Sequence, residues 1–205
     1  MIKKIFTSTI VFAIAFVLGT GFAFAQNDTS HLEFKGIPIN GKIDDFVKKL
    51  QAQGFTIVKK EDLGVMMNGQ FTGKEAEVMI LNTKRTKTVW KVVVYLPKQT
   101  SWYSIKSEYK YYTEMFTKKY GTPLHTFSFF SEPYYEGDGY EMQAIRNEKC
   151  TYFSGYHTQE GIISVDISKY QQIKIAYEDS ANTTLMDREK EDAVINDIWK
   201  LLFLR

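Results

Sequence analysis

The chain has 205 residues, and its 26 Lys and Arg against 24 Asp and Glu leave a formal net charge of +2. The two signs are mixed along the chain, whereas proteins that bind nucleic acid or an anionic membrane surface concentrate Lys and Arg, so neither partner is expected. Cys150 is the only cysteine, which excludes an intramolecular disulfide. A chain of this length can bury one sizeable core by packing alone.

The first 25 residues have the pattern of an export signal. Lys3 and Lys4 precede an apolar run that ends in Ala23-Phe24-Ala25, an A-x-A cleavage site. We expect a signal peptide at 1–25 and one domain at 26–205, periplasmic or secreted. Loss of both lysines would leave 24 basic and 24 acidic residues. Because no cysteine at the cleavage site could carry a lipid, no membrane anchor is expected after cleavage; an uncleaved signal acting as an anchor is the alternative.

Two segments have helical periodicity. Apolar residues recur at i, i+3, i+4 and i+7 over about 42–53, and Gly54 follows where a helix end favours positive φ. A longer stripe of the same spacing, rich in aromatic residues, runs over about 102–120 and is followed by Gly121 and Pro123. Both segments are predicted to be helices that bury these stripes.

The remaining segments favour short antiparallel strands. Residues 75–81 and 89–96 are rich in β-formers, and Asn68-Gly69 predicts a type I′ hairpin turn between 65–67 and 70–72. Further strands are predicted at 124–130, 140–146, 151–156, 162–167 and 173–177. The expected fold class is therefore α+β, with antiparallel sheet flanked by helices.

The two halves of the domain can be superposed by a shift of 82 residues. This shift takes Phe71-Thr72-Gly73 onto Phe153-Ser154-Gly155, and Tyr95 onto Tyr177. It indicates a tandem duplication of a helix-plus-meander unit, with repeats at about 34–97 and 98–180 and extra residues around 131–141 in the second copy. The alternative is a chance match between two meanders.

A third helix is predicted at about 185–203. It follows Asn182-Thr183-Thr184, a triplet typical of helix starts, and its apolar stripe includes Ile195, Ile198 and Trp199. The stripe is expected to pack on the rest of the domain, and an exposed partner surface is the alternative.

Several segments together resemble a known group of proteins. They are the start of the mature chain from His31 to Gly41, then Phe46-Val47, Leu50 and Gly54-Phe55, and later Lys119-Tyr120-Gly121-Thr122-Pro123. In these segments, over most of residues 31–180, the chain resembles small exported proteins of unknown function from gut Bacteroidota. The resemblance implies an α+β domain in the envelope or outside the cell, and no active residues to transfer. The architecture is also similar to the β-lactamase-inhibitor-protein fold, which does not imply a function.

Evidence for an enzyme is weak. Cys150 and His157 are the nearest approach to a nucleophile and a base, but they would lie roughly 20 Å apart on an extended strand unless the chain bends at Gly155. No phosphate-binding loop, nucleophile elbow or pair of catalytic carboxylates is present. The three histidines, His31, His125 and His157, are scattered without the spacing of a zinc site. We expect no cofactor, no metal and no catalytic residue.

The best candidate for binding is the loop at 132–141, which combines tyrosines, carboxylates and glycines. Its candidate residues are Tyr134, Tyr135, Glu136, Asp138 and Tyr140. Calcium could use such oxygens, but the ligand order of an EF-hand is absent. Tyrosine-rich loops on a rigid sheet are common recognition surfaces, and a solvated acidic loop is the alternative.

Two smaller features complete the candidates. Tyr103 follows Trp102 at the start of the second helix, where an aromatic ring could stack on a sugar. Asp179-Ser180-Ala181 resembles the acceptor for O-glycosylation in exported Bacteroidota proteins, which makes Ser180 a candidate in a predicted loop.

From these observations we expect a non-catalytic binding or interaction module of the cell envelope, with an envelope or secreted protein as partner. The alternatives are a small-ligand or glycan binder that uses the tyrosine-rich loop and, less favoured, a thiol-dependent hydrolase. A glycan binder would need Tyr134, Tyr135 and Tyr140 to form an exposed concave wall.

Overall fold

The structure is a computed structural model that describes residues 30–203, with side chains described up to residue 195. The predicted signal peptide lies outside the described residues. The described part contains α1 (Ile43–Ala52), α2 (Trp102–Tyr120), α3 (Glu141–Arg146) and α4 (Ser180–Phe203). Its strands are β1 (Glu33–Phe34), β2 (Ile37–Pro38), β3 (Thr56–Glu61), β4 (Gly64–Phe71), β5 (Lys74–Asn82), β6 (Val89–Tyr95), β7 (His125–Phe130), β8 (Cys150–His157), β9 (Gly161–Ile167) and β10 (Ile173–Asp179). The predicted α+β class is confirmed.

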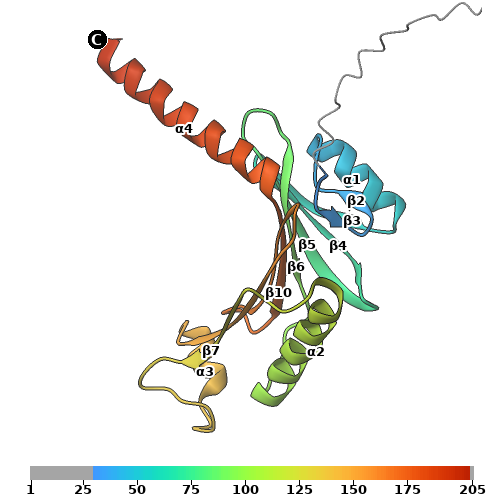
Figure 1. Ribbon diagram of the computed structural model, residues 1–205, viewed down its shortest axis with the longest axis vertical. Coiled ribbons are helices and arrows are strands. Elements are labelled where there is room, and N and C mark those ends of the chain that lie inside the picture. Colours follow the sequence, from blue (N-terminus) through green and yellow to red (C-terminus); the bar gives the residue numbers. More distant parts are fainter. Residues whose placement is uncertain (1–29, 204–205) are drawn as a thin grey trace, which may run out of the picture.

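One eight-stranded antiparallel sheet organises the molecule, in the order β3-β4-β5-β6-β10-β9-β8-β7. Strands β3 to β6 form one meander after α1, and β7 to β10 form a second after α2. The last strands of the two meanders, β6 and β10, pair with each other at the centre of the sheet. The sheet is strongly curved, with α1 and α2 on one side of it (Figure 1).

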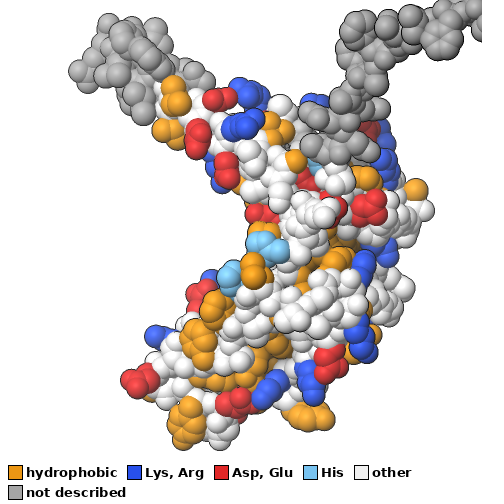
Figure 2. Space-filling view, viewed as in Figure 1, with side chains coloured by type: hydrophobic (Ala, Val, Ile, Leu, Met, Phe, Trp, Pro, Cys, Tyr) orange, Lys and Arg blue, Asp and Glu red, His pale blue; other side chains and the backbone are white. Residues whose placement is uncertain are grey.

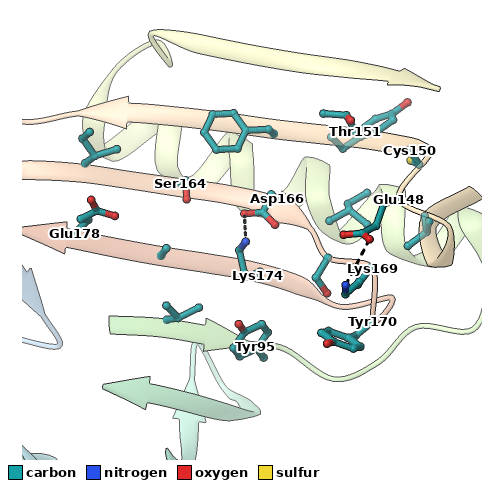
Figure 3. A pocket seen from close by; sticks show the side chains of 18 of the residues that line it. Tyr95, Glu148, Cys150, Thr151, Ser164, Asp166, Lys169, Tyr170, Lys174 and Glu178 are labelled. Carbon is teal, nitrogen blue, oxygen red and sulfur yellow. Dashed lines mark hydrogen bonds and ion pairs between the residues drawn. The ribbon is translucent and has the colours of Figure 1, made fainter. Parts of the chain in front are cut away.

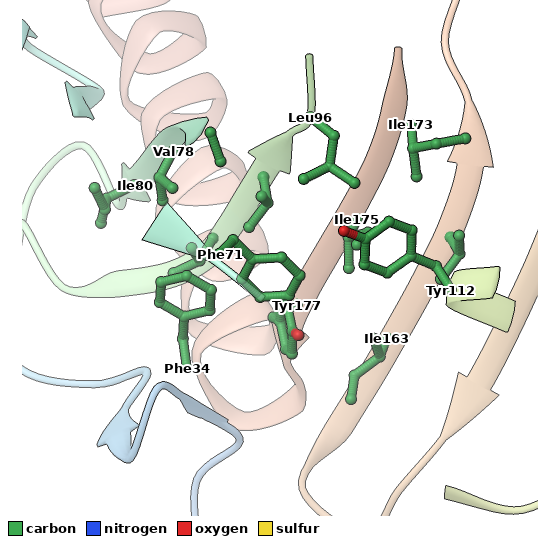
Figure 4. Close-up of a cluster of buried hydrophobic side chains, with 14 of the residues drawn as sticks. Phe34, Phe71, Val78, Ile80, Leu96, Tyr112, Ile163, Ile173, Ile175 and Tyr177 are labelled. Atoms are coloured by element: carbon green, nitrogen blue, oxygen red, sulfur yellow. The ribbon is translucent and has the colours of Figure 1, made fainter. Parts of the chain in front are cut away.

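The core lies between the sheet and these two helices. The predicted helical stripes are confirmed: Ile43, Phe46, Val47 and Leu50 of α1 and Ile105, Tyr109, Tyr112 and Phe116 of α2 are all buried. They meet aliphatic side chains of the central strands and an aromatic cluster that includes Phe34, Phe71 and Tyr177 (Figure 4). We call this the helix-covered face of the sheet and the opposite side the open face.

The first described residues lie beside the start of α4. The carboxylate of Asp179, the last residue of β10, accepts hydrogen bonds from the backbone N–H groups of Leu32 (2.9 Å) and Asn182 (2.9 Å) and contacts Nδ1 of His31 at 3.0 Å. The contact with Asn182 caps the N-terminus of α4. Further along α4, the Glu189 carboxylate accepts N–H bonds from Arg85 and Thr86 in the β5–β6 loop.

The start of the last helix was predicted wrongly. Asn182-Thr183-Thr184 lies inside α4, which begins at Ser180 directly after β10. The cap is Asp179, the last residue of β10, whereas the sequence predicts that the strand ends at residue 177 and that Asp179 and Ser180 lie in a loop. Among the described helices, including α4, none combines the length and the apolar character needed to cross a membrane.

The predicted turn at Asn68-Gly69 is also wrong. Residues 68 and 69 lie within β4, paired with Glu77 and Ala76 of β5. The turn is four residues later, at Thr72-Gly73, where Phe71 pairs with Lys74 and both turn residues have positive φ (50° and 80°). Two residues with positive φ make a type I′ turn. The Thr72 hydroxyl lies 2.8 Å from the Tyr112 hydroxyl, a tertiary contact that favours this turn.

The predicted strand at 140–146 is a helix, α3. Glu141, Ala144 and Ile145 are its buried residues, and this spacing of i, i+3 and i+4 fits a helical turn and not an alternating strand. α3 and the preceding loop form the insertion expected between the first two strands of the second meander.

The specific superposition by 82 residues is wrong, although the order helix then four-stranded meander does occur twice. Phe71 faces the core, whereas Phe153 lies on the open face, and Ile80 is fully buried whereas Ile162 is 37% exposed. In β4 the residues that face the core have odd numbers, whereas in β8, the matched strand, they have even numbers. A shift by an even number therefore pairs residues that lie on opposite faces of the sheet. An origin by duplication stays a prediction.

Candidate binding surface

The open face carries a hollow of about 780 Å³. Its floor is formed by Ser164, Ala176 and Val93, which lie side by side on adjacent strands. Gly155 continues this row on β8, where the ring of Phe153 lies against it. On either side lies a row of larger residues, one formed by Phe153, Asp166, Lys174 and Tyr95, the other by His157, Ile162, Glu178 and Lys91. Figure 2 shows the molecule hollowed on the side away from α1 and α2, between α4 and the part that carries α3 and β7.

Ion pairs cross the strands of this surface. Lys174 lies 3.1 Å from Asp166, and Lys169 pairs with Glu148 at the rim (Figure 3). Lys91 lies 2.7 Å from Glu178. Burial raises the pKa of Asp166 above its usual range, and the neighbouring Lys174 and Lys91 only partly oppose this effect. The surface is thus paired in charge but places one carboxylate where its ionised form is poorly solvated.

The pH dependence of stability should reveal this carboxylate. A group whose pKa is raised by folding stabilises the protein below its ordinary pKa and loses that contribution as the pH rises through the folded value. We expect Asp166→Asn to gain stability relative to wild type as the pH rises from about 4 to 7. Chemical denaturation at several pH values measures the difference. In a Lys174→Met background, the stability difference between Asp166 and Asp166→Asn should depend more strongly on pH, because the cation that opposes the rise in the Asp166 pKa is gone. A stability difference that does not vary with pH would contradict the raised pKa of Asp166.

Aromatic residues extend the open face to the sheet edge. Phe153 pairs with Phe127 of β7, with ring centroids 6.1 Å apart, and Phe129 lies next on the same face. Phe127 and Phe129 are each 49% exposed. The rings of His125 and His157 meet edge to face at 6.2 Å. This edge of the open face is therefore apolar and accessible.

The candidate residues of the predicted binding loop at 132–141 lie in different surroundings and do not form one site. Tyr134 packs against the core, and its hydroxyl accepts bonds from Gln143 and Asn147. The Asp138 carboxylate accepts hydrogen bonds from the backbone N–H groups of Tyr135 and Tyr140, so it stabilises the conformation of the loop. Tyr135 and Tyr140 are exposed (66% and 61%), but neither lines the hollow of the open face or the groove beside α2. The three tyrosines do not form one concave wall.

Glu136 of this loop reaches a different place, the N-terminal part of α2. Its carboxylate accepts hydrogen bonds from Lys106, from Nε1 of Trp102 (3.3 Å) and from the Tyr152 hydroxyl (3.2 Å). The bond from Lys106 lowers the pKa of Glu136. These residues and the exposed Tyr103 line a groove of about 570 Å³. The sequence pointed to Glu136 and Tyr103 separately, and the fold brings them together.

Cys150 and His157 are not brought together. They are the first and last residues of β8, which is continuous between them, so they stand roughly 20 Å apart along the strand. Burial raises the pKa of Cys150 to about 12, which keeps the thiol protonated and unreactive. This pair supplies no nucleophile and base.

The remaining candidates have structural explanations or lack a site. Ser180 is exposed at the first turn of α4, but the neighbouring Asp179 of its motif is buried and used as the helix cap. Within the described residues, no group of three or more His, Cys, Asp or Glu side chains is placed to hold a metal ion.

The open face was missed because its residues come from five strands. The sequence does contain a pattern typical of a second, polar face: in β9 and β10, polar residues alternate with buried ones, namely Ser164, Asp166, Lys174 and Glu178. Alternation identifies two faces but not which face lacks a covering layer. No family model matches the chain, and neither the curated proteins nor the solved structures give a significant match.

Proposed function

We propose that this protein is an exported, non-catalytic binding module whose open face receives a protein partner in the periplasm or outside the cell. The observation that carries the proposal is the one-sided architecture: α1 and α2 cover one face of the sheet, while the central strands of the other face surround a hollow. A sheet commonly leaves one face to solvent, but solvated faces are mainly polar, and this one bears an apolar edge and a floor of small side chains.

The dimensions support a protein partner. Five strands about 4.8 Å apart and about seven residues long present a surface of roughly 24 by 23 Å, or about 550 Å², close to the roughly 600 Å² that each side of a small interface buries. Its paired charges and exposed phenylalanines also resemble interface composition, in which aromatic residues are enriched.

The groove beside α2 supports a second candidate, the binding of a small ligand or glycan. Trp102 and Tyr103 supply aromatic surface there, and Glu136 supplies a carboxylate within the same groove. The three hydrogen bonds that Glu136 already accepts weaken this candidate, because a ligand would have to compete for that carboxylate.

The experiment compares the two surfaces by filling each in turn. Ser164→Arg places a long side chain beside Ala176 in the hollow, and Tyr103→Arg changes the groove beside α2 at an exposed position. Tagged wild type and both variants would be cross-linked and recovered from the envelope fraction of the producing bacterium. We expect recovery of the specific partner to fall about tenfold with Ser164→Arg only.

Circular dichroism would first confirm that both variants fold. Loss of partners only with Tyr103→Arg would indicate that the groove beside α2 is the binding surface. Unchanged recovery with Ser164→Arg would overturn the open face as the binding surface.

A further inference from the structure

The two edges of the large sheet differ in chemistry. At one edge, β3 carries Lys59, Lys60 and Glu61, and its register with β4 is interrupted after Ile57. Charged residues and bulges are the devices by which proteins prevent the pairing of exposed edges. The β3 edge is thus protected against another strand.

The opposite edge, β7, lacks these devices. Its residues His125–Phe130 include no Lys, Arg, Asp, Glu, Pro or Gly, and its register with β8 is regular throughout. Every residue from His125 to Phe129 is exposed. Among the described residues no strand lies beyond β7, so one side of its backbone offers N–H and C=O groups to a further strand.

The sequence of β7 is suited to pairing with itself. Phe127 and Phe129 flank Ser128 symmetrically and point to the same, open face. In an antiparallel pair centred on Ser128, each Phe127 would lie opposite Phe129 of a second copy, so two cross-strand aromatic pairs form at once. Thr126 would lie opposite Phe130, and no like charges would meet.

We propose that two copies of this chain associate through β7, antiparallel and in register at Ser128, to form one continuous sheet. The twofold axis would run perpendicular to the sheet, so both open faces would point the same way. Because the β3 edges are charged and interrupted, association would stop at the dimer. This proposal shares Phe127 and Phe129 with the open face but does not use the hollow, so it can hold whether or not the hollow binds a partner.

Engineered cysteines test the register. Residue 128 lies opposite itself in this dimer, at a Cβ separation of about 5 Å, whereas the two copies of residue 126 lie four residues apart, roughly 13 Å. Ser128→Cys should therefore give a disulfide-linked dimer on mild oxidation, and Thr126→Cys should not. Cys150 is buried and should not compete. Electrophoresis without reductant gives the readout.

Light scattering of the wild type tests association without a cross-link, with a mass of two copies expected at micromolar concentration. Phe127→Lys/Phe129→Lys and Phe127→Glu/Phe129→Glu should each be monomeric alone, because like charges then face each other, and should pair when mixed. Val58→Lys on the β3 edge, a similar change at a 58% exposed position, should leave the dimer intact.

Three results would overturn the proposal. They are a monomeric wild type at all concentrations, equal cross-linking at positions 126 and 128, and a dimer that survives in both charged variants. A variant that fails to fold is recognised by circular dichroism, and the cysteine pair then decides alone.

Discussion

Asp179→Ala should destabilise the protein by about 3–5 kcal/mol, a large effect for the removal of one carboxylate. The carboxylate is fully buried, and it contacts the N–H groups of Leu32 and Asn182 and the ring of His31. Alanine would leave a buried N–H group without a partner, which costs about 1–3 kcal/mol, and would remove the cap of α4, which costs about 1 kcal/mol. The lost contact with His31 adds to both.

Chemical denaturation measures the loss, and hydrogen exchange locates it. The Leu32 amide should lose protection selectively, because its acceptor is gone while the sheet remains paired. His31→Ala removes only one of the three contacts and should cost about 1 kcal/mol. Asp187→Ala, an exposed carboxylate in α4, is the control and should stay within about 0.5 kcal/mol of wild type. A loss below about 1 kcal/mol for Asp179→Ala would refute its anchoring role.

Gly69→Ala should cost about 3 kcal/mol, although the residue follows an asparagine in a dipeptide typical of turns. A Cβ atom at position 69 would lie 2.2 Å from Cδ1 of Phe55, whose buried ring covers the glycine in the middle of β4. The ring is part of the core and contacts Phe34, so it cannot move aside without loss of packing. Urea denaturation measures the cost.

A double-mutant cycle distinguishes this packing from an ordinary turn. Phe55→Ala alone should cost about 3–5 kcal/mol, but Gly69→Ala should add little once the ring is absent. A glycine that served a turn through its backbone would instead cost the same with or without Phe55. Gln70→Ala, at an exposed neighbouring position, is the control for a change in β4.

The sequence predicted most of the elements because their signals are local. Both aromatic and aliphatic helix stripes, and the strands from β5 to β10, follow from the spacing of apolar residues and from the glycines that end them. Errors arose where a distant contact outweighs the local signal. The ring of Phe55 packs against Gly69, so this glycine lies in a strand and not in a turn. The Tyr112 hydroxyl contacts Thr72 in the observed turn. Leu32 and His31 contact Asp179, the cap of α4.

The candidate sites were less predictable than the fold. The composition of the loop at 132–141 predicts a binding site, yet three of its five candidate residues form hydrogen bonds within the protein: Tyr134, Glu136 and Asp138. Composition cannot tell whether a carboxylate faces solvent or a neighbouring N–H group. The hollow of the open face escaped notice because each strand contributes only alternate residues to it.

Sequence by itself determined the α+β class and the helices α1 and α2, because hydrophobic periodicity acts within a few residues. Only the tertiary structure decided that α1 and α2 share one face, that Ser164, Ala176 and Val93 meet across three strands, and that β7 is an edge without protection. These are properties of strand order and register, which depend on contacts between residues far apart in the chain.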